Sequence, residues 1–243
     1  GPAPPLAPLL PERARELGLP ADTLVCSPIG DAQAAVFAVA GSTDDTAILN
    51  LGTGGQLSVI TKDFAVVDGL ETRPMPAGTH LLVGASLCGG WSYAYLERFF
   101  RTVAKEFAGV DLDDAEVFRR MNSFAAEAVP EAGGISVDPR FSGSRGDPDI
   151  KGAIVGIDTA NLTPANLVRG FLNGIVDELA AMAAKIGTGR IRRVLLAGNL
   201  ARRNPVVLDI ARARFGVPCA LSQSDEEAAC GAALAAAAGL GGV

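Results

Sequence analysis

The chain has 243 residues, of which 49% are hydrophobic, 20% charged and only 5% aromatic. A chain of this length can bury a substantial core, and an apolar content made mostly of alanine, valine and leucine favours an α/β fold. The formal net charge of −6 excludes nucleic acid and anionic membranes as general partners, because a polyanion would release few counterions on binding such a surface.

The cysteines and the single histidine limit the possible metal and redox chemistry. Cys26, Cys88, Cys219 and Cys230 stand far apart among apolar or small residues, which suits reduced thiols and offers neither a zinc motif nor a disulfide framework. His80 alone gives no basis for a Ser-His-Asp triad or a histidine metal site. The opening GPAPPLAPLL resembles a linker more than a signal peptide. We therefore expect a cytoplasmic protein with no metal ligands of its own.

The first predicted elements are a short strand and a buried helix. The strand covers Leu24 to Pro28, and the helix covers Asp31 to Val39, with its polar residues at its start. Two β-rich runs follow, Thr46 to Leu51 and Gln56 to Thr61. The glycines of Gly52-Thr53-Gly54-Gly55 between them predict a hairpin.

The middle of the chain is predicted to be mainly helical. After a strand at His80 to Ser86, Gly89-Gly90 opens a helix that continues through YAYLERFFRTVAKEF. A second helix is predicted at Asp113 to Glu127. The segment Ala132 to Gly152 shows no clear period and is predicted to be mostly loop, and Ala153 to Ile157 to be a strand.

Strands and helices alternate in the last third of the chain. The longest helix is predicted at Thr163 to Ile186, because Thr163-Pro164 is typical of an N-cap and a first helical position. After it we predict a strand at Arg192 to Ala197, a turn at Gly198 to Asn204 and a helix at Pro205 to Phe215. A strand at Val217 to Leu221 and a last helix at Asp225 to Ala238 follow. Paired strands followed by this alternation indicate a mixed sheet flanked by helices.

Asp31 is the carboxylate that opens the helix Asp31 to Val39. Aspartate is a preferred N-cap, because its side chain accepts hydrogen bonds from free backbone amides of the first turn. A carboxylate there is also kept ionised by the helix dipole and can accept a proton from a substrate hydroxyl. The two roles are compatible, so the sequence predicts Asp31 as a helix cap and a candidate general base.

The segment Gly52-Thr53-Gly54-Gly55 has two interpretations. As a hairpin turn, it uses glycines to supply positive φ angles. As a phosphate cradle, Gly52 and Gly54 bring backbone amides close to an anion, and Thr53 adds a hydroxyl donor. No GxxxxGK[ST] occurs in the sequence, so a P-loop kinase is excluded as far as a motif can exclude it.

Two further pairs are candidates for a nucleotide site. Gly89-Gly90 at the head of a helix can serve close packing, or can let a diphosphate lie against the helix N-terminus. Gly198-Asn199 forms the turn after a predicted strand, where α/β proteins bind nucleotides. An ordinary β–α connection would have the same pattern, so the second interpretation stays open.

The order of these features resembles the C-terminal half of the FGGY carbohydrate kinases, which belong to the actin-like ATPase superfamily. VCSPIGDAQAAVFAVAG resembles the stretch with the catalytic aspartate, GTGG the phosphate hairpin and LVGASLCGGW the Gly-Gly segment. FSGSR, at Phe141 to Arg145, resembles a family loop, and VLLAGNLARRNPVVLDIARARFGVP the adenosine segment, with the Arg203-Asn204 pair retained. The resemblance implies a ribonuclease H-like, actin-like ATPase fold.

The resemblance also implies a domain division. Residues 1–44 would be the tail of an N-terminal kinase domain with the hinge helix, and residues 45–243 the C-terminal nucleotide-binding domain. The family's first phosphate motif, of the DxGT type, is absent, as is the domain that carries most sugar-binding residues, so the chain resembles a C-terminal portion. Gly54 replaces a small hydroxyl residue of the family, which loosens one phosphate contact.

The resemblance implies ATP and Mg²⁺ as cofactors, with Mg²⁺ carried by the nucleotide. Asp31 would take the proton of a sugar hydroxyl as it attacks the γ-phosphoryl group. The β/γ-phosphates would lie against Gly52-Thr53-Gly54, and the diphosphate against Gly89-Gly90. The adenine face would lie against Gly198-Asn199.

The expected substrate is a ketose or polyol. The resemblance is greatest to family members that phosphorylate sedoheptulose, which is therefore favoured over xylulose or a polyol. Sugar choice depends on the absent domain, and the chain alone is expected to be inactive. Another actin-like ATPase and a non-catalytic nucleotide-binding module that assembles with a partner chain stay open, as does a homodimer. A Rossmann-like protein is disfavoured by the early hairpin and the lack of GxGxxG.

Overall fold

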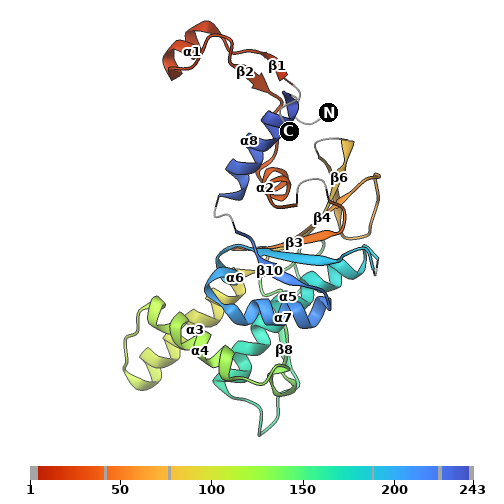
Figure 1. Cartoon of the computed structure of the whole chain (residues 1–243). Helices are drawn as coiled ribbons and strands as arrows, with labels where there is room; N and C mark the ends of the chain where they lie inside the picture. Colours follow the sequence, from red (N-terminus) through yellow and green to blue (C-terminus); the bar gives the residue numbers. More distant parts are fainter. Residues whose placement is uncertain (1–4, 41–42, 76–77, 188, 224–225, 241–243) are drawn as a thin grey trace.

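A six-stranded mixed sheet forms the centre of the computed structural model, which describes residues 5–40, 43–75, 78–187, 189–223 and 226–240 (Figure 1). Its strands are β3 (Thr46–Leu51), β4 (Gly55–Thr61), β5 (Glu71–Pro74), β6 (His80–Ser86), β9 (Arg193–Ala197) and β10 (Cys219–Leu221). The strand order is β10-β9-β3-β4-β6-β5. From β3 to β5 neighbours pair antiparallel, whereas β9 runs parallel to β3 and β10 to β9. The mixed sheet predicted from the element order is confirmed.

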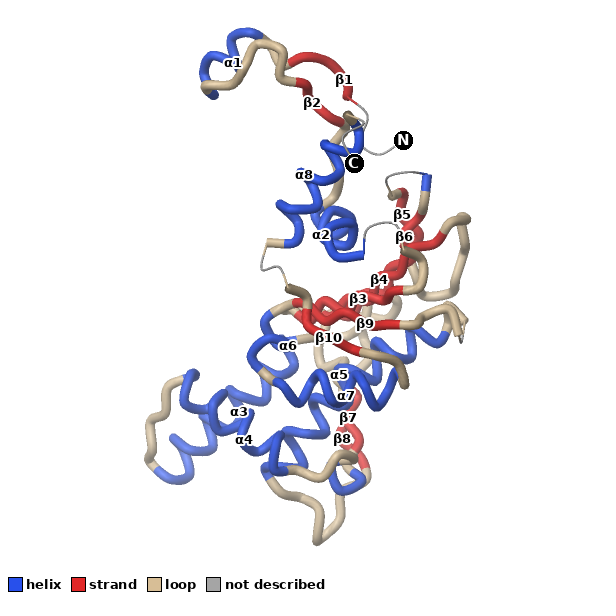
Figure 2. The backbone as a smooth tube through the Cα atoms, viewed as in Figure 1, coloured by secondary structure: helices blue, strands red, loops and turns tan. Residues whose placement is uncertain are grey.

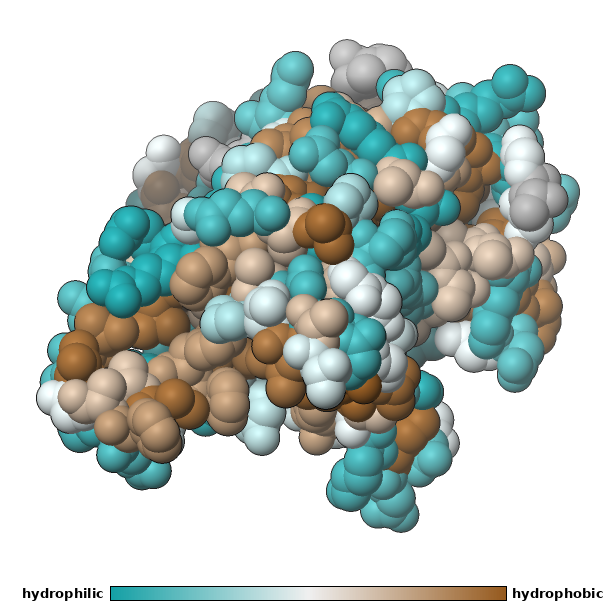
Figure 3. All heavy atoms as spheres, turned by 90° about the horizontal axis from the view of Figure 1, so that it is seen from below, coloured by the Kyte–Doolittle hydropathy of each residue, from teal (hydrophilic) through white to brown (hydrophobic). Residues whose placement is uncertain are grey.

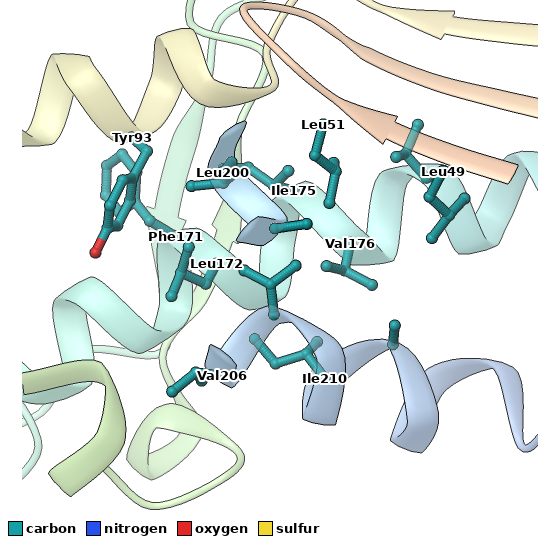
Figure 4. Close-up of a cluster of buried hydrophobic side chains, with 14 of the residues drawn as sticks. Leu49, Leu51, Tyr93, Phe171, Leu172, Ile175, Val176, Leu200, Val206 and Ile210 are labelled. Carbon is teal, nitrogen blue, oxygen red and sulfur yellow. The ribbon is translucent and has the colours of Figure 1, made fainter. Parts of the chain in front are cut away.

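One face of the sheet is covered by long helices. They are α3 (Gly90–Ala108), α4 (Asp114–Glu127), α5 (Pro164–Ala184) and α7 (Pro205–Phe215). Because side chains alternate along a strand, Leu49 and Leu51 of β3 face these helices and pack with Phe171 and Ile175 of α5 in the larger core (Figure 4). Thr163 caps α5, its hydroxyl accepting from the Asn166 amide at 3.2 Å, as the Thr-Pro pair predicts.

The opposite face of the sheet carries α2 (Asp31–Ala40) and α8 (Glu227–Gly239), which lie against each other (Figure 1). Val36 and Ala40 of α2 pack with Ile48 and Val83 of the sheet in a second, smaller core. Gly231 lets the two helices approach closely, since a Cβ atom there would overlap the carbonyl group of Ala34. α2 and α8 therefore form one unit above the sheet.

The N-terminal segment forms a small unit of its own, beyond α8 and away from the sheet (Figures 1 and 2). It consists of β1 (Pro5–Pro8), α1 (Pro11–Leu17) and β2 (Leu24–Cys26), with β1 and β2 paired antiparallel. Its leucines are largely exposed, Leu6 and Leu17 each at 63%. The prediction of a linker there was wrong, because the backbone of residues 5–8 pairs with β2 and residues 11–17 form a helix.

The structure confirms that the segment from 132 to 152 is mostly loop, and adds to it a 3₁₀ turn, η2 (Ala132–Gly134), and β7 (Ser136–Asp138), which pairs with β8 (Ala153–Val155). Two other predictions are corrected. The predicted turn from 198 to 204 contains a short helix, α6 (Asn199–Arg203), and β5 was not predicted. These elements are too short for a hydrophobic period to reveal them. The predicted domain boundary at residue 44 stays a prediction, and the predicted start of the last helix at Asp225 lies outside the described residues.

Candidate functional site

The predicted glycine motifs meet at one edge of the sheet. β3 and β9 run parallel with Asn50 opposite Ala197, so Gly52 and Gly198 leave the sheet side by side. Gly198 has a φ of 89° and packs against β3, where a Cβ atom would lie 2.6 Å from the carbonyl oxygen of Leu51. Only glycine fits this contact, and it brings the turn after β9 against the hairpin.

Gly89 and Gly90 serve close packing between the hairpin and α3. The amide of Gly90 donates to the Gly52 carbonyl at 2.8 Å, and the amide of Trp91 donates to the Thr53 carbonyl at 2.9 Å. A Cβ atom on Gly90 would lie 2.6 Å from the Gly52 oxygen, and one on Gly89 would overlap Gly54. The helix N-terminus therefore binds the hairpin, and the alternative of Gly90 presenting a free amide to a diphosphate is not supported.

The same contacts orient the remaining amides of the hairpin turn. In a trans peptide the N–H points opposite to the C=O, and none of the described peptide bonds is cis. Since the Gly52 and Thr53 carbonyls face α3, the amides of Thr53 and Gly54 face away from it, and neither donates to another described residue. Thr53 is exposed, so its hydroxyl is available beside these two amides. The turn offers three donors to an anion.

A cavity of about 580 Å³ opens beside this turn, between α3, α4 and α6. Its lining residues are Gly52, Thr53, Gly90, Trp91, Tyr93, Ala94, Ala115, Phe118, Arg119, Asn122, Asn199, Leu200, Arg203 and Asn204. Phe118, Ala115 and Leu200 give it an apolar wall, whereas Asn122 and Asn204 contribute amide groups. The cavity brings together the predicted residues Gly52, Thr53, Gly90 and Asn199.

The sequence did not predict that α4 forms part of the wall of this cavity, or that the side chains of Tyr93, Asn122 and Asn204 form a hydrogen-bonded cluster there. Tyr93 Oη donates to Asn122 Oδ1 at 2.9 Å, and Asn204 Nδ2 donates to the same oxygen at 3.0 Å. Asn204 is only 1% exposed, and its Oδ1 has no hydrogen-bond partner among the described residues. Arg119 at the rim is held by Glu116, with two hydrogen bonds of 2.7 Å each that keep the pKa of Glu116 low, at about 2.

A second cavity, of about 370 Å³, lies on the α2 side of the same edge. Gly52 and Asn199 line both cavities, so the two meet at the hairpin turn. Polar side chains of the sheet, including Asn50, Gln56 and Ser58, line the second cavity together with Ala32 of α2. This cavity therefore connects the turn with the start of α2.

Asp31 is the first residue of α2 and lies next to Ala32. It is exposed, and its Oδ1 accepts a hydrogen bond of 2.7 Å from the Ala32 amide, the one hydrogen bond that Asp31's side chain makes to the part of the chain that the structure describes. The Gly30 carbonyl accepts from the Ala34 amide at 2.8 Å, which places Gly30 at the N-cap position. Asp31 thus lies one residue after the cap position predicted for it, although it makes the predicted hydrogen bond to a first-turn amide, and its Oδ2 has no hydrogen-bond partner among the described residues.

An ion pair ties α8 to the same edge. Arg202 of α6 pairs with Glu227 of α8 at 2.9 Å, with side chains 25% and 16% exposed. The Ser222 hydroxyl donates to Glu227 at 2.8 Å. α2 and α8 are thereby held over the second cavity. Among the described residues no group of three or more His, Cys, Asp or Glu side chains gathers that could hold a metal ion, and none of the helices found there is long and apolar enough to cross a membrane.

Comparisons with known proteins place this geometry in a family. A family model described as the FGGY family of carbohydrate kinases, C-terminal domain, matches residues 47–240. Sedoheptulokinase of Mus musculus is 29% identical over 230 residues, an alignment that covers 89% of this chain and 46% of that protein. A glycerol kinase of Methylibium petroleiphilum is 29% identical over 240 residues, covering 89% of this chain and 44% of that protein.

A solved structure shows the same fold. The gluconate kinase from Lactobacillus acidophilus matches with a TM-score of 0.84 at 20% identity, and the match covers 99% of this chain and 48% of that one. The chain spans about half the length of the curated relatives it matches.

Proposed function

Because this chain belongs to the FGGY family of carbohydrate kinases, we propose that it forms the nucleotide half of an ATP-dependent kinase site for a ketose or polyol. It has the ribonuclease H-like, actin-like ATPase fold of such kinases, with the mixed sheet flanked by helices. The observation that carries the proposal is the Gly52-Thr53-Gly54 turn: Gly52 lines both cavities, Thr53 lines the larger one, and the amides of Thr53 and Gly54 donate to no other described residue.

The larger cavity would take the nucleoside of ATP. Its volume of about 580 Å³ falls in the range of small-molecule sites, and its walls combine apolar side chains with a few polar groups, as such sites do. Phe118 and Leu200 would contact the base. Asn199, which lines both cavities, would lie along the base, and Gly198, which lines the second cavity, would lie beside Asn199.

The phosphates would run along the hairpin turn toward the second cavity. The amides of Thr53 and Gly54 and the Thr53 hydroxyl would bind the β/γ-phosphates, since preorganised donors stabilise the charge of phosphoryl transfer. Gly89 and Gly90 would act indirectly, by holding the turn in place. Mg²⁺ bound to the phosphates would supply further charge neutralisation.

Asp31 would be the general base. The sugar hydroxyl would enter from the α2 side, and the Asp31 carboxylate would accept its proton while the hydroxyl oxygen bonds to the γ-phosphorus and the bond to the ADP oxygen breaks.

Sedoheptulose is the substrate we favour, with xylulose or a polyol as the alternative. Sedoheptulokinase and glycerol kinase match this chain at the same 29% identity, so the preference rests on the motifs at Asp31 and Gly89-Gly90. The sugar would be bound mainly by the half of the relatives that this chain does not match. A homodimer is part of the same proposal, since α3 exposes an apolar face.

Sugar-dependent ADP formation tests the proposal. The protein to assay is this chain preceded by the N-terminal half of a sedoheptulokinase, with sedoheptulose, xylulose and glycerol as acceptors. We expect turnover with one acceptor, and a loss of roughly 10²–10⁴-fold in kcat for Asp31→Asn, with little change in ATP binding. Asp45→Asn serves as the control variant. Retained turnover in Asp31→Asn would remove Asp31 as the base, and turnover with none of the sugars would count against the kinase assignment.

A further inference from the structure

The backbone that follows β6 is held to α5 by one serine hydroxyl. Ser86 ends β6, pairs with Gly55 of the hairpin and is 8% exposed, and Glu178 belongs to α5. We propose that Ser86 and Glu178 are positioning residues that hold residues 86–91 against the Gly52-Thr53-Gly54 turn, and so keep the amides of that turn aimed at the β-phosphate. The inference rests on the proposed nucleotide site and names the residues that position its phosphate turn.

The Ser86 hydroxyl both accepts and donates a hydrogen bond. The Cys88 amide donates to Ser86 Oγ at 3.0 Å, and Ser86 Oγ donates to Glu178 Oε2 at 2.6 Å. A backbone amide can only donate, and a hydroxyl has a single proton, so that proton is directed to the carboxyl group. The backbone just after β6 is thereby tied to a side chain 92 positions further along the chain.

Cys88 depends on this hydroxyl for the hydrogen bond of its backbone amide. Cys88 is completely buried, and its amide donates to no other group among the described residues. Buried amides almost always have an acceptor, because leaving one unpaired costs free energy. The orientation of the peptide unit before Cys88 is therefore fixed by Ser86.

The phosphate turn packs on the segment that Ser86 fixes. At one end of this segment, a Cβ atom on Gly54 would lie 2.7 Å from the Ser86 carbonyl oxygen. At the other end, the first two amides of α3 donate to carbonyl groups of the turn at 2.8 and 2.9 Å. Between these ends, Gly89 has no side chain to restrict its dihedral angles. The direction in which the chain enters α3 therefore depends on the peptide unit that Ser86 holds.

A loosened segment would weaken binding of the part of the nucleotide that touches the turn. Preorganised donors stabilise an anion well because they need no rearrangement when it binds. If the carbonyl groups of the turn lose α3 as their partner, the peptide planes that carry the Thr53 and Gly54 amides can rotate, and the two donors no longer converge. The loss would fall on the β-phosphate and would spare the base, the ribose and the α-phosphate.

Calorimetric titration of this chain with ADP and with AMP tests the inference, because only ADP has a β-phosphate. We expect the unchanged chain to bind ADP about tenfold or more tightly than AMP. Ser86→Ala leaves the Cys88 amide unpaired, and the ratio of the two affinities should fall about fivefold. Glu178→Leu removes only the acceptor of the hydroxyl, so its ratio should fall less, by about threefold. Glu178→Gln keeps an acceptor oxygen, so its ratio should stay within about 1.5-fold of that of the unchanged chain.

Two control variants separate positioning of the turn from general stability. Ser123→Ala removes a hydrogen bond of 2.8 Å from a serine to a glutamate on the exposed side of α4. Ile210→Val removes one methylene group from the larger core, where Ile210 is 1% exposed, and so lowers stability without touching residues 86–91. Both controls should leave the ratio of the two affinities unchanged.

The outcomes distinguish the inference from the proposed function. An unchanged ratio in Ser86→Ala, or in Glu178→Leu if Ser86→Ala does not fold, would overturn the inference and leave the nucleotide site in place. A ratio in Glu178→Gln as low as that in Glu178→Leu would also overturn it, because the acceptor oxygen would then not matter. An unchanged chain that binds neither nucleotide, or binds both equally, would contradict the proposed phosphate turn itself, and the inference with it.

Discussion

Glu178 of α5 is a carboxyl group held partly out of water. The Ser86 hydroxyl donates to its Oε2 at 2.6 Å, and it lines a third cavity with Asp138, Arg140 and Lys185. Burial raises the pKa of Glu178, an effect that the hydrogen bond from Ser86 and the charge of Arg140 oppose. Ionisation is therefore harder in the folded than in the unfolded chain.

The raised pKa predicts a pH-dependent effect of Glu178→Gln. Because the folded pKa lies above the unfolded one, the free energy of unfolding decreases as the pH rises through these two values, and glutamine avoids this loss. At pH 7 the variant should be more stable by about 1 kcal/mol or less, a rise of a few degrees in Tm. Thermal unfolding at pH 7 and below pH 4 measures it. The gain should vanish at the acidic pH, where both states are protonated, and a gain that persists there would contradict the explanation.

At the scale of residues, the sequence predicts the candidate site residues that belong to short local motifs. Local motifs identify the Gly52-Thr53-Gly54 turn and the Gly198 turn, and the structure places them side by side because each follows the end of one of two paired parallel strands. Asn122 could not be found in this way, since its partners lie 29 and 82 positions away along the chain. The hydrophobic period of a single sequence predicts which residues form a helix, but it does not predict which side-chain amides of two helices and a turn come together in the fold.

At the scale of elements, the contact between α2 and α8 predicts the sign of one substitution. Alanine is a better helix former than glycine by about 1 kcal/mol, so Gly231→Ala would stabilise α8 in isolation. The Cβ atom would overlap the Ala34 carbonyl, and overpacking of this kind costs roughly 1–3 kcal/mol. We expect net destabilisation of the chain in urea unfolding. A stabilised variant would show that the helices do not pack so closely.

The contact between the hairpin and α3 supports a second prediction at this scale. Gly89→Ala should push α3 away from Gly54 and displace the turn. We expect the variant to be less stable and to bind the nucleotide about tenfold more weakly. Gly146→Ala is the matched control, because a Cβ atom there has no neighbour within 4 Å. ADP titration of both variants measures the effect. Unchanged affinity in Gly89→Ala would show that the turn does not depend on α3.

Whether a helix or strand can be predicted from the sequence depends on its length. The helices at α3, α4, α5 and α7 and the strands β3, β4, β6 and β9 are long or patterned enough for their periods to be recognised. α6 has five residues and β5 has four, and neither completes a period that distinguishes it from a loop.

For the whole molecule, the exposed apolar residues mark surfaces that can associate. Along α3, large side chains recur at every fourth position and stay exposed: Tyr95 at 49%, Phe99 at 50%, Val103 at 42% and Phe107 at 93%. Seen from below, apolar atoms gather on the side of α3 and α4 (Figure 3). A contiguous apolar surface of this kind is typical of an interface.

This face predicts concentration-dependent self-association. Replacing Phe99 and Phe107 by serine should shift the sedimentation of the chain toward that of a monomer, with little loss of stability because both side chains are exposed. Phe64→Ser, at an equally exposed site away from α3, is the control. A chain that sediments as a monomer at all concentrations, with or without the substitutions, would contradict a homodimer through α3.

The central claim is that the edge of the sheet at Gly52 and Gly198 binds a nucleotide. Calorimetric titration of this chain with MgATP tests it most directly, in the unchanged chain and in Thr53→Arg, Gly198→Arg and the control Gly146→Ala. We predict measurable binding by the unchanged chain and the control, and a loss of about tenfold or more in both arginine variants, whose side chains would fill the turn. Unaltered affinity in both arginine variants, or no binding by the unchanged chain, would contradict the account.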